Sequence, residues 1–364
     1  MPSEFISGLR LSGMFYHEAI LPVLQSKFSG LRHSAALLGS GSEVLGFDTV
    51  MSTDHHWGPR LLIFLNEQDY SQIHNDLHGC LRHELPHSFY GYPTNFTQPN
   101  FDDSGVQLLE ATYSGPINHR VEIMTMGQFI KDTLGAELDI PLEATDWLTM
   151  PSQLLRSVTA GAVYHDDLGL EDFRKQFNFY PRDVWLYLLA AGWKRISQEE
   201  AFVGRTGFVG DDLGSQVIAA RLVRDIMQLC FLMERQYAPY PKWFGSAFAQ
   251  LQCAERLTPI LGAVIHGESW KEREQSLSQA YKIIATMHND LHITPPLPTD
   301  TWSYFDRPFK VIHGDRFVTA IKEVIADETI RNIPVDIGSV DQFSDSSDLI
   351  TSANLRQRLK KLYS

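Results

Sequence analysis

The sequence lacks the features that would direct it to a membrane or out of the cell. It contains no apolar run close to the about 20 residues that a membrane-spanning helix requires. Its start, Met-Pro-Ser-Glu-Phe, has neither the basic nor the apolar segment of a secretory signal. We therefore expect a cytoplasmic protein that has no membrane partner.

Cysteine is scarce, and the three cysteines are far apart. Cys80, Cys230 and Cys253 form no Cys-x-x-Cys pair, so neither a zinc knuckle nor a disulfide framework is indicated. The sequence predicts reduced, structural thiols.

Positive charge is also in short supply. The 31 Lys and Arg residues are outnumbered by 44 Asp and Glu residues, which gives a formal net charge of −13. Proteins that bind nucleic acids neutralise phosphates with Lys and Arg, so this balance argues against a nucleic-acid partner. A triphosphate would need a local positive site in such a chain, whereas a small neutral or cationic acceptor is easier to accommodate.

The length of 364 residues and the hydrophobic content of 43% are enough for two domains with separate cores. In the first part, residues 35–38, 61–65 and 120–125 have the pattern of short strands among helices. From about residue 146 strand signals become scarce and apolar helical faces prevail. We predict an α+β protein, with a mixed-sheet domain over 1–145 and an all-helical bundle over 146–364.

A loop of small residues follows the first apolar run. Gly39, Ser40, Gly41 and Ser42 allow backbone N–H groups to approach a polyanion closely. Ser42 is a suitable N-cap for a short helix over 43–45, and a helix N-terminus favours phosphate. Asp54 then precedes the apolar run 61–65. Such a loop followed by an acid suits metal-assisted phosphoryl or nucleotidyl transfer.

These residues resemble two known signatures. Gly39-Ser40, a short helix and Ser52-x-Asp54 resemble the nucleotidyltransferase superfamily, which has a DNA polymerase beta-like fold. The fuller string GSGSEVLGFD…S-x-DHxWGPR, together with the Tyr-Ala-Pro-Tyr-Pro-Lys-Trp run at 237–243, resembles more narrowly the family called domain of unknown function 4037. The resemblance implies a mixed-sheet nucleotidyltransferase core in which the Gly-Ser pair holds a triphosphate such as ATP. It also implies two Mg²⁺ ions, held by an Asp-x-Asp pair and a third carboxylate.

The sequence departs from that pattern at one position, because the second acid of the pair is replaced by His56. His56 would favour a softer ion such as Mn²⁺, contact a phosphate, or leave one weak metal site, with Asp48 and Glu43 as alternative acids. On the resemblance, Glu122 in the strand 120–125 is the third carboxylate or a general base; the alternative is a solvent-facing side chain.

Three further residues are candidates for nucleotide binding. Arg60 can hold phosphate oxygens with two hydrogen bonds, although a surface salt bridge is equally consistent with its position. In the helical half, Lys242 is a candidate phosphate contact, and Tyr237 or Tyr240 is a candidate for stacking on a base. Aromatic residues at such spacing more often belong to a core.

The function that these observations favour is transfer of a nucleoside monophosphate, AMP from ATP, to a hydroxyl of a small-molecule acceptor, with release of pyrophosphate. The arrangement of a core and a bundle resembles the aminoglycoside nucleotidyltransferases. His165 to Asp167 are candidate acceptor contacts in a non-periodic loop. Two alternatives stay open: a degenerate nucleotide-binding sensor that transfers nothing, and a zinc-dependent hydrolase that uses His55, His56, His74 and His78.

Overall fold

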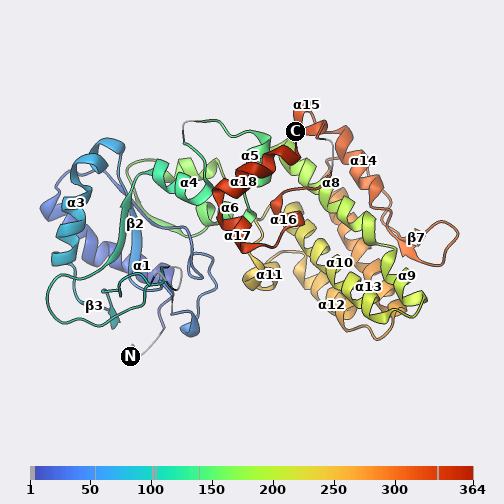
Figure 1. Cartoon of the computed structure of the whole chain (residues 1–364), viewed down its shortest axis with the longest axis horizontal. Helices are drawn as coiled ribbons and strands as arrows, with labels where there is room; N and C mark the ends of the chain where they lie inside the picture. The colour runs from blue at the N-terminus through green and yellow to red at the C-terminus, as the bar shows by residue number, and fades with distance from the viewer. Residues whose placement is uncertain are drawn as a thin grey trace. The chain divides into compact units, whose positions relative to one another are not determined.

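The structure, a computed structural model, describes residues 5–53, 55–100, 102, 105–138, 140–333 and 336–363. The chain forms two compact units (Figure 1). Unit 1 contains Met1–Pro141 and Leu154–Asn178, and unit 2 contains Leu142–Gln153 and Phe179–Ser364. Residues 154–178, which the sequence pattern placed with the helical half, therefore lie in unit 1.

Unit 1 is built on a four-stranded mixed sheet with the order β5-β2-β1-β6. Its strands are β1 (Ser34–Leu37), β2 (Arg60–Phe64), β5 (Arg120–Met124) and β6 (Ala162–Asp166). β1 pairs antiparallel with both β2 and β6, and β2 pairs parallel with β5. The strands expected over 35–38, 61–65 and 120–125 are confirmed within one residue at each end.

The remaining elements of unit 1 are helices and one small hairpin. They are α1 (Gly8–Phe15), a π-helical turn (Tyr16–Ile20), α2 (Leu21–Lys27), a 3₁₀ turn (Val50–Ser52), α3 (Glu67–Glu84), β3 (Ser88–Phe89), β4 (Tyr92–Pro93), α4 (Met126–Leu134) and α7 (Leu170–Lys175), with α6 (Ser152–Thr159) crossing the division between the units.

The core of unit 1 lies between the sheet and helices α1 and α3. Strand alternation turns Leu61 and Ile63 into the same buried cluster as Leu11 of α1 and Leu77 of α3. On the other face of the sheet, Phe64 packs edge to face against Phe129 of α4, with ring centroids 5.6 Å apart. Both faces of the sheet are thus covered. Polar side chains such as Arg60 and Arg120 lie at the ends of its strands.

Two local expectations were wrong. Residues 42–46 form turns, closed by a 2.8 Å hydrogen bond from Phe47 N to Ser42 O, and not the short helix expected over 43–45. The segment 161–169, expected to be an irregular loop, contains strand β6. Its first three residues are apolar or aromatic, but His165 and Asp166 end that pattern after three positions, so its extended form depends on pairing with β1.

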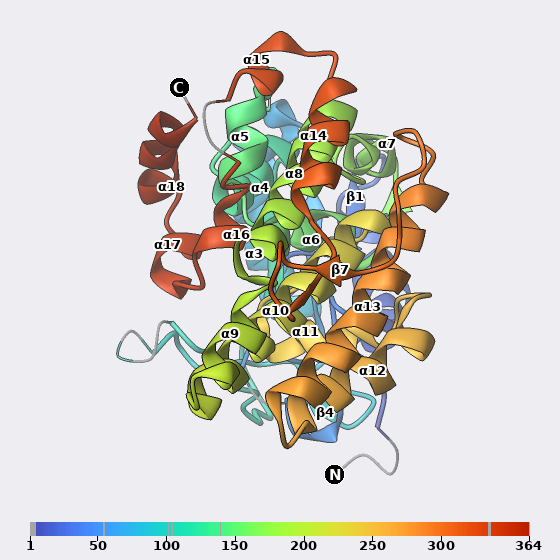
Figure 2. The same ribbon diagram turned by 90° about the vertical axis from the view of Figure 1, so that its right-hand side faces the viewer.

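Unit 2 is helical (Figure 2), and its long helices α8, α10, α12 and α13 are packed against one another pairwise. Its elements are α5 (Ala144–Thr149), α8 (Arg182–Glu199), α9 (Phe202–Phe208), α10 (Asp212–Met233), α11 (Pro241–Phe248), α12 (Ala254–His266), α13 (Trp270–Asp290), β7 (Trp302–Ser303), β8 (Lys310–Val311), α14 (Asp315–Glu323), α15 (Glu328–Arg331), α16 (Val340–Phe343), α17 (Ser347–Thr351), α18 (Ala353–Leu359) and a 3₁₀ turn (Lys360–Leu362).

The predicted α+β class is confirmed, with a mixed sheet in one unit and a helical second unit. Within the described residues, none of the helices has both the length and the apolar character needed to cross a bilayer.

Candidate functional site

The loop after β1 presents backbone donors. Gly39 and Gly41 have φ angles of +89° and +134°, a region that side chains other than glycine rarely adopt. Gly39 N–H donates to Ser157 O at 2.9 Å and so fixes the start of the loop. Within the described part of the chain, the next three N–H groups, of Ser40, Gly41 and Ser42, have no hydrogen-bond acceptor. Successive N–H groups in such a turn form a concave site for an anion.

Arg60 lies against this loop and holds its shape. The guanidinium Nη2 donates to Ser40 O and to Glu43 Oε1, each at 2.6 Å, and Nε donates to the same carboxylate oxygen at 2.9 Å. Arg60 is 6% exposed and Glu43 is 3% exposed. Because Glu43 neutralises its charge, Arg60 here supports the loop, and its role as a phosphate contact stays a prediction.

A second arginine stands beside the first. Arg120 begins β5 and is the register partner of Arg60 at the start of β2. Its guanidinium donates to Glu122 Oε1 at 3.1 Å, to Gln107 Oε1 at 2.9 Å and to Nδ1 of His56. Only 13% of the Arg120 side chain is exposed, against 46% for Glu122.

His56 is held as a neutral base in this cluster. Burial, followed by the positive charges of Arg120 and Arg60, lowers the pKa of His56 to about 4. Its φ of +61° is unusual for a residue with a side chain and is a form of local strain often found at functional sites. Since Nδ1 accepts from Arg120, Nε2 is the nitrogen left to contact a ligand.

The metal site implied by the resemblance is not assembled by the described residues alone. Glu122 is ion-paired with Arg120, and the positive charge of Arg120 opposes a cation next to His56. Asp54, the main candidate ligand, lies outside the described residues. Mg²⁺ or Mn²⁺ dependence therefore stays a prediction.

The two candidates from the helical half differ in exposure. Tyr237 is 4% exposed and packs edge to face against Tyr180, so its ring lies in the core of unit 2. Lys242 is exposed, with its ammonium 5.1 Å from the ring centroid of Trp243. Tyr240, the alternative to Tyr237, lines a cavity of about 270 Å³ together with Phe244. Tyr240 is thus better placed than Tyr237 to contact a ligand.

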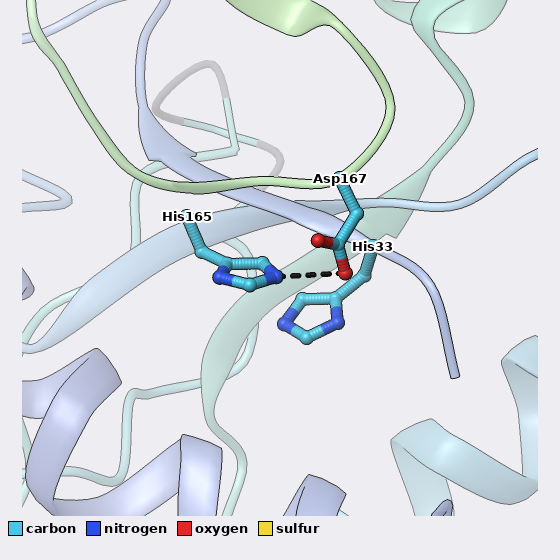
Figure 3. Close-up of side chains that lie close together, drawn as sticks. All are labelled: His33, His165 and Asp167. Atoms are coloured by element: carbon cyan, nitrogen blue, oxygen red, sulfur yellow. Dashed lines mark ion pairs between the residues drawn. The ribbon is translucent and has the colours of Figure 1, made fainter. Parts of the chain in front are cut away.

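The histidines of the expected zinc site do not gather. His74 on α3 contacts Tyr70 O through Nδ1 at 2.9 Å, and His78 packs against the ring of His119. Among the described residues, the group that brings three metal-ligating atoms together is His33, His165 and Asp167 (Figure 3). His165 and Asp167 were expected to contact an acceptor, and the sequence pattern did not single out His33.

The glycine loop and the side chains of Arg60, Glu43, Arg120, Gln107 and His56 form the candidate site. The sequence pattern did not single out Arg120 or Gln107. Arg120 was treated only as the start of a strand. The signal that could have found it is that Arg120 begins one expected strand and Arg60 directly precedes another, since parallel neighbours in register place such residues side by side.

Comparison with known proteins adds a family for one part of the chain. Residues 147–244 match the family model described as Domain of unknown function (DUF4037), which confirms the resemblance to that family over this segment. The matched segment includes the Tyr237–Trp243 run, whereas the glycine loop lies outside it. No curated protein matches the chain.

A solved structure is also similar, at a low level. It is a nucleotidyltransferase-like protein from Exiguobacterium sibiricum 255-15, with 9% sequence identity and a TM-score of 0.31. The similarity covers 86% of this chain and 91% of the other.

Proposed function

We propose that unit 1 binds a nucleoside triphosphate at the loop over residues 39–46 and that the protein is a nucleotidyltransferase. The observation that supports this most is the row of three unbonded N–H groups, of Ser40, Gly41 and Ser42, on a loop fixed by Arg60. Backbone donors on a rigid turn bind phosphate oxygens without needing an excess of positive side chains. That suits a chain with a net charge of −13.

In this proposal the two arginines have different tasks. Arg60 keeps the loop in its binding conformation through Ser40 O and Glu43. Arg120, which is less completely neutralised because its partner Glu122 is exposed, supplies charge to a phosphate that reaches the start of β5. Glu122 then loses its partner and becomes free to accept the proton of an acceptor hydroxyl. The reaction is transfer of a nucleoside monophosphate, AMP if ATP is the donor, with release of pyrophosphate.

Isothermal titration of ATP, GTP, CTP and UTP into the full chain, each with Mg²⁺, with Mn²⁺ and without metal, tests the proposal. We expect one nucleotide to bind, and binding to fall at least tenfold in Arg120→Met and in Asp54→Ala. The matched control is Arg182→Met, which removes an exposed arginine of unit 2 and should leave binding unchanged. Failure of every nucleotide to bind would refute the proposal.

A nucleotide-binding protein that transfers nothing is the second candidate, and the contact between His56 and Arg120 favours it. The substitution of the second acid by histidine places a neutral ring, bonded to a guanidinium, where a metal-binding carboxylate is implied. His56→Asp should then add metal-dependent nucleotide binding to a wild type that binds nucleotide without metal. If the wild type already needs metal and His56→Asp gains nothing, this second candidate fails.

A further inference from the structure

We propose that His33, His165 and Asp167 form a binding site for a divalent transition-metal ion of the Zn²⁺ type. The site lies in unit 1, where His33 directly precedes β1, His165 is in β6 and Asp167 directly follows β6, and none of these residues belongs to the glycine loop. It does not depend on nucleotide binding or on the proposed transfer.

The pairing of two strands brings the three residues together. β1 and β6 run antiparallel, with Ser34 opposite Asp166 and Ala35 opposite His165. The ladder continues one step further, since Asp167 N donates to His33 O at 3.1 Å. Because side chains alternate along a strand, His33, His165 and Asp167 share one face. Ser34 and Asp166 lie on the other face, where Ser34 Oγ donates to Asp166 Oδ1 at 2.7 Å.

The ligating atoms already converge. One atom from each of the three side chains lies within 4.8 Å of the other two, and His165 Nε2 is 2.9 Å from Asp167 Oδ2 (Figure 3). The imidazole rings of His33 and His165 stack with centroids 4.5 Å apart. Ligands about 2.1 Å from a tetrahedral Zn²⁺ are about 3.4 Å from one another. Small side-chain rotations would therefore bring all three onto an ion.

The surroundings of His33 are those of a metal ligand. His33 Nδ1 lies 3.1 Å from Leu31 O, and an Nδ1–H donated there leaves the lone pair on Nε2. Metal-binding histidines commonly donate the other ring N–H to a backbone carbonyl in this way. In this tautomer the Tyr16 hydroxyl donates to that Nε2 at 2.9 Å, so an ion would take the place of this hydrogen bond. Tyr16 is the first residue of the π-helical turn, a feature frequent at functional sites.

Asp167 is available to an ion as well. Arg32 donates to the backbone oxygen of Asp167 at 2.5 Å and not to its carboxylate. Among the described residues, the ion pair that the carboxylate makes is the one with His165, within the proposed site. Binding an ion therefore breaks no salt bridge to a lysine or arginine within the described part of the chain.

The ligand set defines the class of ion. Two imidazoles and one carboxylate suit Zn²⁺ and related first-row ions, whereas Mg²⁺ and Ca²⁺ prefer oxygen ligands alone. Three protein ligands leave at least one position for water or a small molecule, as in metal sites that take part in chemistry.

Titration of Co²⁺ into the chelator-treated full chain, without nucleotide, tests the site through the visible absorption of bound Co²⁺. We expect one Co²⁺ per chain, displaced by Zn²⁺ and not by Mg²⁺. Affinity should fall at least tenfold in Asp167→Asn and in His165→Gln. His74→Gln, on α3, is the control and should bind Co²⁺ as the wild type does.

Thermal denaturation with and without Zn²⁺ distinguishes a metal ligand from a residue that only supports the fold. Zn²⁺ should raise the thermal midpoint of the wild type and not that of Asp167→Asn, even if their metal-free midpoints agree. Asp167 has a 40% exposed side chain, so its variant is expected to fold even if His165→Gln does not. Absence of stoichiometric Co²⁺ binding in the wild type would overturn the proposal. So would unchanged binding in Asp167→Asn, or loss of binding in His74→Gln.

Discussion

The two units bury a glutamate in opposite ways. In unit 1, Glu43 is 3% exposed and is held by the guanidinium of Arg60. In unit 2, Glu200 is 7% exposed and accepts backbone N–H groups from Ile312, His313 and Gly314, at 2.6, 3.0 and 3.3 Å. One carboxylate is ion-paired with a guanidinium, and the other accepts hydrogen bonds from backbone N–H groups at the start of α14.

The different partners of Glu43 and Glu200 indicate different structural roles for the two carboxylates. Burial raises the pKa of Glu200 to about 7, because the three N–H donors only partly compensate its lost hydration. Near pH 7, Glu200 is therefore about half protonated, and it links the C-terminal end of α8 to the start of α14. Glu43 instead holds the Arg60 guanidinium, which also donates to Ser40 O and so keeps the glycine loop in place.

The largest expected effect comes from breaking the ion pair of unit 1. Arg60→Met leaves Glu43 buried without its partner, so we expect the free energy of unfolding to fall by about 3–5 kcal/mol. Urea denaturation measures this, and the double variant Arg60→Met/Glu43→Leu should recover a large part. Lys131→Met breaks an exposed pair with Glu137 and should leave the unfolding free energy almost unchanged. Equal losses in Arg60→Met and Lys131→Met would contradict the distinction.

The next effect concerns the buried carboxylate of unit 2. The raised pKa means that folded Glu200 binds a proton more tightly than unfolded Glu200 between pH 4.5 and about 7. Stability from this group is thus present below pH 4.5 and is lost as the pH rises towards 7. At about 1.4 kcal/mol per pKa unit, the loss amounts to about 3 kcal/mol.

Glu200→Gln should remove this contribution to the slope of unfolding free energy against pH. Its amide oxygen can still accept the hydrogen bonds from Ile312 and His313. Glu323→Gln, an exposed position on α14, is the control and should keep the slope. A slope that is the same in Glu200→Gln and the wild type would show that Glu200 does not titrate in this range.

A smaller effect separates Gly41 from Gly46, two of the three glycines of the loop over residues 39–46. In Gly41→Ala the new methyl group would lie 2.6 Å from Arg60 Nη2 and from Glu43 Oε2, so we expect a loss of about 2 kcal/mol. Gly46 has a φ of +76° and no atom within 4 Å of a new methyl group, so Gly46→Ala should cost about 1 kcal/mol. Thermal denaturation ranks the two. The nucleotide response should vanish in Gly41→Ala and persist in Gly46→Ala; the reverse result would place the site elsewhere.

The smallest effect is expected at the apolar surface of unit 2. Phe208 is 66% exposed at the end of α9, and Phe208→Ser should change the unfolding free energy by less than about 0.5 kcal/mol. The buried counterpart is Phe317, stacked on Trp193 at 3.8 Å, and Phe317→Ala should cost about 3–5 kcal/mol. A substantial loss in Phe208→Ser would show that this surface is covered in solution.

The sequence predicted the elements whose signals are local. Apolar runs marked β1 and β2, alternating side chains marked β5, and glycines marked the loop after β1. Strand β6 was not predicted because His165 and Asp166 interrupt the apolar pattern. Its extended form comes from pairing with β1. Long-range pairing of this kind leaves little trace in the residues themselves.

The candidate site shows the same limit. Gly41 and Arg60 were singled out from residue type, but burial of Arg60 against Glu43 depends on contacts between segments 17 residues apart. Arg120 gained its place only from the register of β5 against β2. Residue chemistry could suggest which groups bind a phosphate, and only the pairing of strands could say which groups support them.

The return of the chain to unit 1 has a consequence for biosynthesis. The chain leaves unit 1 after Pro141 and returns at Leu154 to supply β6, the neighbour of β1. On the ribosome, unit 1 therefore cannot close its sheet until β6 has emerged, well after β5 is available. Until then β1 has an unpaired edge, which is a template for aggregation. A fragment that ends near residue 145 would keep this edge permanently, whereas one extended to Asn178 would carry the whole sheet.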